Sequence, residues 1–153
     1  MKKKFVLIGA GHSHLTFLKN TNAGFFNSFS ITLIETNLKL IYSGMTPGYI
    51  LGNYELDNIY IDITKICNHY NIDFINCEIE NIDFENRKIF FKDKFIKYDY
   101  LSINTGSIVD LTIIPGAKSY GIPVKPLSSF LEKVDIIKNS KNKQISFVGA
   151  GFA

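Results

Sequence analysis

Cysteine is scarce in this sequence, and its spacing argues against two kinds of site. The chain has two cysteines, Cys67 and Cys77, and neither belongs to a CxxC or CxxxxC pair. Local zinc sites and vicinal redox disulfides depend on such short spacings. We therefore expect two buried free thiols, and we expect no metal site.

Long apolar runs and a strong net charge are also absent. No window approaches the ~18 consecutive apolar residues of a membrane-spanning helix. The N-terminal apolar run is broken by glycines, which argues against a signal peptide. The net charge is only +3, and we interpret Lys2-Lys3-Lys4 as a solvated start of a strand rather than a nucleic-acid-binding arm. These absences predict a cytoplasmic protein with no nucleic-acid partner.

The length and composition are those of a folded protein. The chain has 153 residues, of which 46% are hydrophobic and 20% are charged. That balance is typical of globular chains and excludes a disordered one. The length suits one domain of ordinary size, or one domain and part of another.

The stretch FVLIGAGHSHL, residues 5–15, has the pattern of a dinucleotide-binding turn. An apolar run meets Gly-Ala-Gly, and leucines at helical spacing follow. In such a turn Gly9 permits the tight bend, and Gly11 removes a side chain that would block a phosphate. Glu35 ends the next apolar run 24 residues after Gly11, close to the ~20 expected for a carboxylate that binds ribose hydroxyls. The alternative is an ordinary α/β turn with Glu35 as a surface acid.

Two histidines make this turn unusual. His14 stands where a third small residue normally lets the helix pack close to the strand. We expect either a wider gap there or a side chain turned away. His12 falls on the first helical turn, where it could donate a hydrogen bond to a phosphate. The alternative for both is polar helix capping with no catalytic role.

The rest of the chain alternates short apolar runs with turn signals. Asp62 is an expected N-cap for the helix that follows it. Glycine and proline in 43–49 argue against a regular element there. The expected elements are strands at 4–8, 30–35, 73–79 and 100–104, an antiparallel meander at about 79–98, helices from Ser13 to about 20, at 62–70 and at 127–138, and an irregular connector at 106–126.

The sequence ends as it begins. ISFVGAG at 145–151 repeats the pattern of FVLIGAG at 5–11, about 140 residues later. We interpret this second run as the first strand of another nucleotide-binding domain. A strand without its covering helix predicts that these residues are the N-terminal part of a larger protein.

Four stretches carry a resemblance to a known family: IGAGHSHL (8–15), YSGMTPGYILGNY (42–54), EIENID (78–83) and YDYLSINTGS (98–107). The last is similar to a YDxLxxATG motif. On these motifs the chain resembles the N-terminal part of the FAD-dependent pyridine nucleotide-disulfide oxidoreductase superfamily. More narrowly, it resembles the subgroup associated with selenide, water dikinase and related to type II NADH dehydrogenases, in which His-Ser-His after the glycines is typical.

The resemblance implies an α/β fold with a Rossmann-like FAD-binding domain, made of a parallel sheet with a small antiparallel β-meander. That domain would span 1–126, and 127–153 would hold a connector helix and the truncated start of an NAD(P)H-binding Rossmann domain. No cysteine lies between Thr36 and Gly48, which excludes the dithiol relay of the disulfide reductases. The resemblance implies FAD binding by Gly9, Gly11, His12, Ser13, Glu35, Ser43, Gly44, Ile79, Thr105 and Gly106, and NAD(P)H binding by Gly149 and Gly151.

The implied activity is hydride transfer from NAD(P)H to the flavin and on to a small-molecule electron acceptor. That acceptor would be a quinone, or a selenium or sulfur species, and a functional link to selenophosphate synthetase is implied. Membrane association would come only from a part beyond residue 153. A different class of function is a non-catalytic nucleotide-binding module, and a further alternative is an enzyme that binds NAD at the first turn.

Overall fold

The structure is a computed structural model, and it describes residues 2–141 and 144–149. The chain divides into two compact units. The first consists of Met1–Leu40 and Ile61–Gly106, and the second of Ile41–Tyr60 and Ser107–Ala153.

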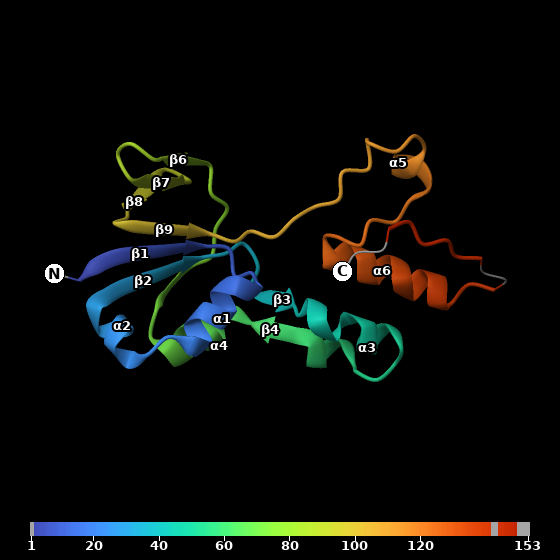
Figure 1. Cartoon of the computed structure of the whole chain (residues 1–153), viewed down its shortest axis with the longest axis horizontal. Helices are drawn as coiled ribbons and strands as arrows, with labels where there is room; N and C mark the ends of the chain where they lie inside the picture. The colour runs from blue at the N-terminus through green and yellow to red at the C-terminus, as the bar shows by residue number, and fades with distance from the viewer. Residues whose placement is uncertain (1, 142–143, 150–153) are drawn as a thin grey trace. The chain divides into compact units, whose positions relative to one another are not determined.

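The first unit is built on a four-stranded parallel sheet (Figure 1). Its strands are β1 (Lys3–Ile8), β2 (Phe29–Ile34), β5 (Asp73–Ile75) and β9 (Tyr100–Ile103), in the spatial order β5-β2-β1-β9. Numbered along the chain, the parallel strands lie in the order 3-2-1-4, which is the order of a Rossmann fold. The predicted fold class is therefore confirmed. The order reverses between β1 and β9, and ligands of open α/β sheets bind beside such a reversal.

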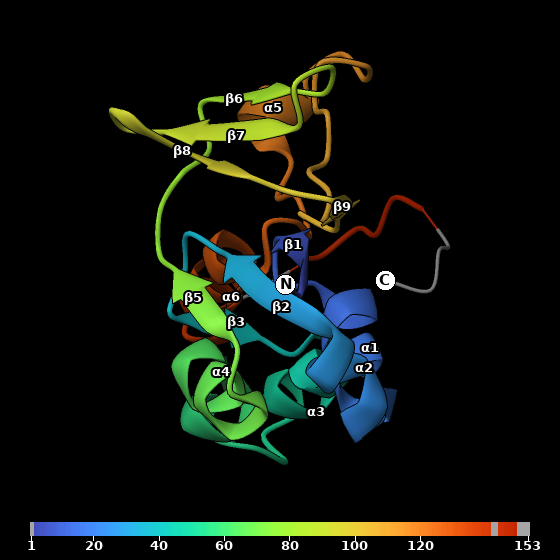
Figure 2. The same cartoon turned by 90° about the vertical axis from the view of Figure 1, so that its left-hand side faces the viewer.

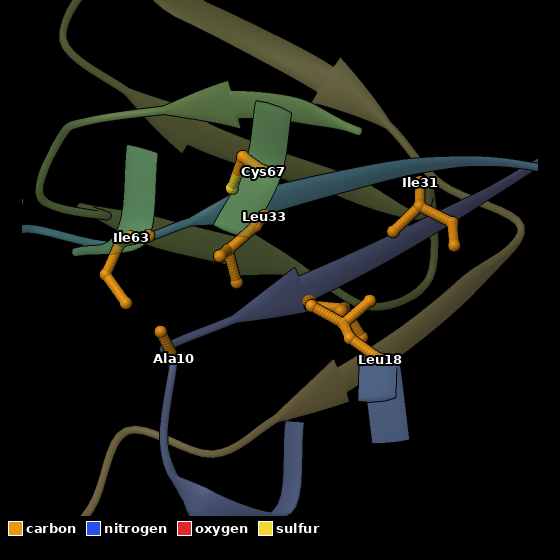
Figure 3. Packing of buried hydrophobic residues seen from close by; sticks show 7 residues of the cluster. Ala10, Leu18, Ile31, Leu33, Ile63 and Cys67 are labelled. Carbon is orange, nitrogen blue, oxygen red and sulfur yellow. The ribbon is translucent and has the colours of Figure 1, made fainter. Parts of the chain in front are cut away.

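The two faces of this sheet are covered by different structures. Alternate residues of a strand point to opposite faces, so Leu7 packs in one cluster with Leu33, while Val6 and Ile8 pack in another. Helices α1 (His12–Asn20), α2 (Ala23–Ser28) and α4 (Ile63–Tyr70) lie on one side and the meander on the other (Figure 2). Figure 3 shows the helix side, where Leu18, Ile63 and Cys67 gather around the sheet.

Local signals define where α4 begins and ends. The Asp62 side chain accepts a hydrogen bond from the Lys65 amide at 3.0 Å, which confirms the predicted N-cap. Asn71 ends the helix in the left-handed conformation, which asparagine tolerates better than most residues.

The strand predicted at 73–79 is too long. β5 ends at Ile75 because its neighbour β2 ends at Ile34, the partner of Ile75. Beyond that point the Asn76 amide donates to the carbonyl oxygens of Glu35 and Thr36, at 2.9 and 2.8 Å. Side-chain hydrogen bonds thus replace the sheet ladder.

The predicted meander is confirmed. β6 (Asn81–Asp83), β7 (Lys88–Phe91) and β8 (Lys94–Lys97) form an antiparallel sheet. Ile89 and Phe91 of β7 are buried against the parallel sheet together with Ile8 and Ile34. The meander therefore covers the face that the helices leave open.

The second unit corrects the interpretation of 43–49 as irregular. A 3-10 helix, η1 (Ser43–Met45), leads into the short helix α3 (Thr46–Ile50). Pro47 lies in the first turn of α3, where the missing N–H of proline costs no helical hydrogen bond. A second 3-10 helix, η2 (Leu56–Ile59), follows. The strands β3 (Lys39–Ile41) and β4 (Tyr60–Asp62) form a two-stranded sheet, and most of their residues are assigned to the first unit.

Helix α6 (Leu127–Lys138) confirms the helix predicted at 127–138, and it is tied to α3. The Tyr49 hydroxyl donates to the Asp135 carboxylate, with oxygen–oxygen distances of 2.9 and 3.2 Å. This hydrogen bond raises the pKa of Tyr49 above its usual value. The connector before α6 is irregular, as predicted, except for the single turn α5 (Ala117–Tyr120).

The strand predicted in the ISFVGAG run is not formed in its described residues. Residues 144–149 have no regular secondary structure, and Phe147 and Val148 are 90% and 86% exposed. A parallel strand is stabilised only beside another strand, and no described strand pairs with this run.

None of the helices in the described part of the chain has both the length and the apolar character needed to cross a membrane.

Candidate functional site

The glycine turn lies at the carboxyl end of β1, against the chain that leaves β9. The Gly9 amide donates to the Ile34 carbonyl oxygen at 2.8 Å, and Gly9 has a φ of +81°. A Cβ on Gly9 would lie 2.7 Å from the Asn104 carbonyl carbon and 2.9 Å from Thr105 Cα. Only glycine fits here, because both the φ and the close backbone approach exclude a side chain.

Gly11 permits a second close approach and precedes α1. Its amide donates to the Asn104 carbonyl oxygen at 3.3 Å. A Cβ on Gly11 would lie 2.6 Å from the amide atoms of the Asn104 side chain. No side chain caps the N-terminus of α1, and His12 and Ser13 are exposed in its first turn. The first amides of a helix have no partner within the helix, so this end can receive an anion.

Glu35 follows β2 and reaches the same turn. Its Oε2 accepts from the Ala10 amide at 2.9 Å, and its Oε1 accepts from the Asn37 amide and the Thr36 hydroxyl, both at 3.0 Å. Partial burial would raise the pKa of Glu35, but these backbone and side-chain hydrogen bonds together lower it below the usual value. The carboxylate is therefore held ionised, as an acceptor beside the glycine turn.

Of the two alternatives predicted for His14, a wider gap or a side chain turned away, the structure excludes the second. The imidazole is 4% exposed. Nδ1 lies 2.6 Å from the Gly9 carbonyl oxygen, and Nε2 lies 2.8 Å from Oγ of Ser102 on β9. In the neutral ring, Nδ1–H donates to the carbonyl and Nε2 accepts from the hydroxyl. His14 is thus a buried structural link, and both ring nitrogens are used within the fold.

Asn104 is the residue of this turn that the sequence reasoning missed. It directly follows β9, its amide donates to the Ile8 carbonyl oxygen at 2.8 Å, and its carbonyl accepts from Gly11. Its side-chain Nδ2 is buried and has no hydrogen-bond partner among the described residues. The sequence does mark Asn104 as unusual, because it stands where the YDxLxxATG motif has alanine.

The structure brings together some of the predicted residues. Thr105 lies against Gly9, and Gly106 follows it at the end of the first unit. Ile79 packs against the cluster that contains Ile8 and Ile34, on the meander side of the sheet. These residues belong to the same unit as the glycine turn.

The remaining predicted residues belong to the second unit. Ser43 and Gly44 are exposed in η1. Gly149 lies in the irregular run 144–149, and Gly151 lies outside the described residues. Their roles in binding FAD and NAD(P)H stay predictions.

The two cysteines of the chain differ in burial. Both are free thiols. Cys67 is 1% exposed, as predicted, and burial raises its pKa to about 11. Cys77 is only partly buried, so the prediction of two buried thiols holds for one of them. The described residues contain no cluster of His, Cys, Asp and Glu suited to a metal ion.

The donors and acceptors of the turn fit a dinucleotide cofactor such as FAD. The helix terminus and the Asn104 amide supply hydrogen-bond donors, which suit phosphate oxygens. The Glu35 carboxylate supplies an acceptor, which suits ribose hydroxyls. Gly9 and Gly11 leave the backbone close to where a phosphate binds in such turns.

Comparisons with known proteins show the family of this chain. The family model for pyridine nucleotide-disulphide oxidoreductases matches residues 3–153. Members of this family are FAD-dependent NAD(P)H oxidoreductases that bind FAD and NAD(P)H.

Individual relatives cover most of this chain. An external alternative NAD(P)H-ubiquinone oxidoreductase of Arabidopsis thaliana mitochondria is 26% identical over 130 residues, which are 76% of this chain and 22% of that protein. An NADH oxidase of Lactococcus lactis is 26% identical over 158 residues, covering 97% of this chain and 35% of that protein. The chain thus spans about a third or less of these relatives.

A solved structure shares the fold. The sulfide:quinone oxidoreductase of Aquifex aeolicus superposes with a TM-score of 0.68 and 24% identity, covering 90% of this chain and 33% of that one.

Proposed function

This chain belongs to the pyridine nucleotide-disulphide oxidoreductase family, and on that basis we propose that it binds FAD at its glycine turn and serves in hydride transfer from NAD(P)H to an electron acceptor. The observation that carries the proposal is the joint position of the Gly9–Gly11 turn, the uncapped α1 terminus and the Glu35 carboxylate. Donors for phosphate and an acceptor for ribose lie at the reversal of strand order, where such ligands bind.

Each group has a defined part in this proposal. The first amides of α1 bind the pyrophosphate, Glu35 orients the adenosine ribose through its hydroxyls, and the Ile79 backbone contacts adenine. Bound FAD supplies the flavin that accepts a hydride and passes electrons onward. His12, Ser13, Thr105 and Gly106 border the phosphates, and Ser43 and Gly44 lie beside the flavin ring.

The proposal includes the domain assignment. Residues 1–126 form the FAD-binding part, and 127–153 lead into an NAD(P)H-binding part in which Gly149 and Gly151 approach the nicotinamide cofactor. We place the protein in the cytoplasm or at the inner face of a membrane.

A quinone is the acceptor we propose. The supporting observation is that two relatives carry quinone in their names, a ubiquinone oxidoreductase and a sulfide-quinone reductase. The absence of cysteines between Thr36 and Gly48 fits an acceptor that takes electrons from the flavin without a dithiol relay. Reoxidation of the reduced protein by a short-chain ubiquinone analogue, followed anaerobically, tests this acceptor.

The narrower assignment is to the subgroup associated with selenide, water dikinase. It is supported by the sequence motifs at 8–15 and 42–54. In that case a selenium or sulfur species replaces the quinone as acceptor. Selenite or polysulfide, but not the ubiquinone analogue, would then reoxidise the reduced protein, and purified selenide, water dikinase would co-elute with it in gel filtration.

An absorption spectrum of the purified full chain tests the central proposal. We expect an oxidised-flavin band, present on purification or after incubation with FAD, that bleaches on anaerobic addition of NADH. The matched control is Gly11→Val, whose side chain would collide with Asn104 and abolish the band. A wild-type protein that stays colourless with FAD would contradict the flavin site. A band that does not bleach would contradict only the hydride donor.

A further inference from the structure

The side chain of Asn104 occupies the space in front of the glycine turn. The Cγ, Oδ1 and Nδ2 atoms of Asn104 all lie 2.6 Å from the position that a Cβ on Gly11 would take. The planar amide therefore faces the α-carbon of Gly11. In dinucleotide-binding turns the second glycine keeps this side open, so that the backbone can approach the pyrophosphate.

Two hydrogen bonds place the backbone of Asn104 beside the glycine turn. Its amide donates to the Ile8 carbonyl oxygen at 2.8 Å, and its carbonyl accepts from Gly11 at 3.3 Å. Asn104 is thus bound to both ends of the turn, on the two sides of the bend at Gly9. These bonds fix the backbone of Asn104, and with it the Cβ of its side chain, beside the turn.

The side-chain amide nitrogen of Asn104 donates no hydrogen bond to the described residues. Nδ2 is shielded from water and has no acceptor, although the great majority of buried polar groups in proteins are hydrogen-bonded. The side-chain amide of Asn76, at the end of β5, donates to two carbonyl oxygens. The contrast marks Asn104 as a donor with no acceptor in the part of the chain that the structure describes.

We propose that Nδ2 of Asn104 donates a hydrogen bond to a phosphate oxygen of the bound dinucleotide. This inference rests on the proposed function and adds to it a side-chain phosphate anchor. Phosphate oxygens only accept hydrogen bonds, and the amide group donates two. A bond to a charged acceptor is among the stronger kinds. Asn104 is therefore a positioning residue for the cofactor phosphates, beside the backbone amides of α1.

Binding measurements on the full chain test this anchor. FAD, ADP and adenosine are titrated against wild type, Asn104→Ala and Asn104→Asp by calorimetry. We expect Asn104→Ala to weaken FAD and ADP roughly 10-fold to 100-fold, the effect of one hydrogen bond to a charged group. Adenosine, which has no phosphate, should bind wild type and Asn104→Ala equally. Asn104→Asp weakens FAD and ADP further, because a carboxylate repels the phosphate.

Two controls separate a phosphate contact from damage to the fold. The melting temperature of ligand-free Asn104→Ala should not fall, since the variant removes an unpaired buried donor. Asn86→Ala removes an exposed amide that bonds to Asp83 in the meander, and it should leave all three affinities unchanged. If Asn104→Ala does not fold, the titrations of Asn104→Asp, which keeps the size of the side chain, test the phosphate contact by themselves.

Two outcomes overturn the inference, and a third contradicts only the proposed function. Equal or tighter binding of FAD and ADP by Asn104→Ala would mean that the amide makes no contact, or blocks the site. Equal weakening of adenosine and ADP would mean that Asn104 only shapes the turn. Wild type that binds ADP but not FAD would contradict the proposed function, while the ADP and adenosine titrations would still test Asn104.

Discussion

Nε2 of His14 lies 2.8 Å from Oγ of Ser102, so a histidine in the first helix is joined to the last strand of the parallel sheet. The other ring nitrogen of His14 bonds to the Gly9 carbonyl at 2.6 Å. One buried side chain therefore fixes the turn, the helix and β9 together. It occupies the place at which a third small residue is usual in such turns.

Replacement of His14 should destabilise the first unit. His14→Ala leaves the buried Gly9 carbonyl and the Ser102 hydroxyl without this partner and opens a void, which predicts a loss of about 2 to 3 kcal/mol in the free energy of unfolding. Ser102→Ala removes one of the two bonds and should cost about 1 kcal/mol. Urea unfolding of both variants measures these losses. Equal stability of His14→Ala and wild type would contradict the structural role.

Two glycines with nearly the same backbone angle should respond differently to alanine. Gly9 and Gly106 have φ of +81° and +84°. A Cβ on Gly9 meets the backbone of Asn104 and Thr105, whereas one on Gly106 meets nothing within 4 Å. Gly106→Ala should cost about 1 to 2 kcal/mol, from φ strain alone. Gly9→Ala should cost about 3 kcal/mol or more, because overpacking adds to the strain.

Urea midpoints of the two variants, measured side by side, test this difference. Gly106→Ala is the matched control, since it carries the strain without the collision. A smaller loss for Gly9→Ala than for Gly106→Ala would contradict the close approach at the turn.

Glu35 should make the stability of the protein depend on acidity. Burial acts to raise its pKa, but its hydrogen bonds lower it below 4.5. A depressed pKa in the folded state stabilises the protein above the unfolded pKa, and this stability is lost as the pH falls through the folded value. Urea midpoints of wild type should therefore drop below about pH 4.5 more steeply than those of Glu35→Gln.

Thr36→Ala serves as the control for Glu35. It removes one hydrogen bond to Oε1 and should reduce the acid-dependent step without abolishing it. Glu35→Gln should also weaken adenosine binding at neutral pH, since the amide lacks the second acceptor oxygen for the ribose hydroxyls. Identical acid profiles for wild type and Glu35→Gln would show that the carboxylate is not held as described.

The two thiols should differ in reactivity. Cys67 is buried and its pKa is raised to about 11. Cys77 is only partly buried, and burial raises its pKa as well. The thiolate is the reactive form. Iodoacetamide at pH 8 should therefore label Cys77 slowly and leave Cys67 unmodified until the protein unfolds. Cys77→Ser should abolish the native labelling, and mass spectrometry of peptides identifies the modified residue.

Local patterns sufficed for much of the fold. Some elements were predicted correctly because each depends on residues only a few positions apart in the sequence. These are the strands from the apolar runs at 4–8 and 30–35, the helix with its N-cap Asp62, and the meander with its turn residues. The tight turn at Gly9 and Gly11 could also be predicted from the glycine spacing, because only glycine lets another backbone segment approach so closely. The position of Glu35 after the second strand could be predicted in the same way. The helix at 46–50 was missed because proline and glycine were taken to break any regular element, although proline is tolerated in a first turn.

Contacts between distant segments were beyond the reach of these patterns. The run at 144–149 has the composition of a strand, but a strand needs a neighbour, and its described residues are unpaired and exposed. β5 is short because β2 ends at Ile34. His14 and Asn104 take their roles from partners about 90 residues away in the chain. Spacing along a sequence reports which backbone conformations are accessible, whereas the pairing of buried polar groups depends on which segments the folded sheet brings together.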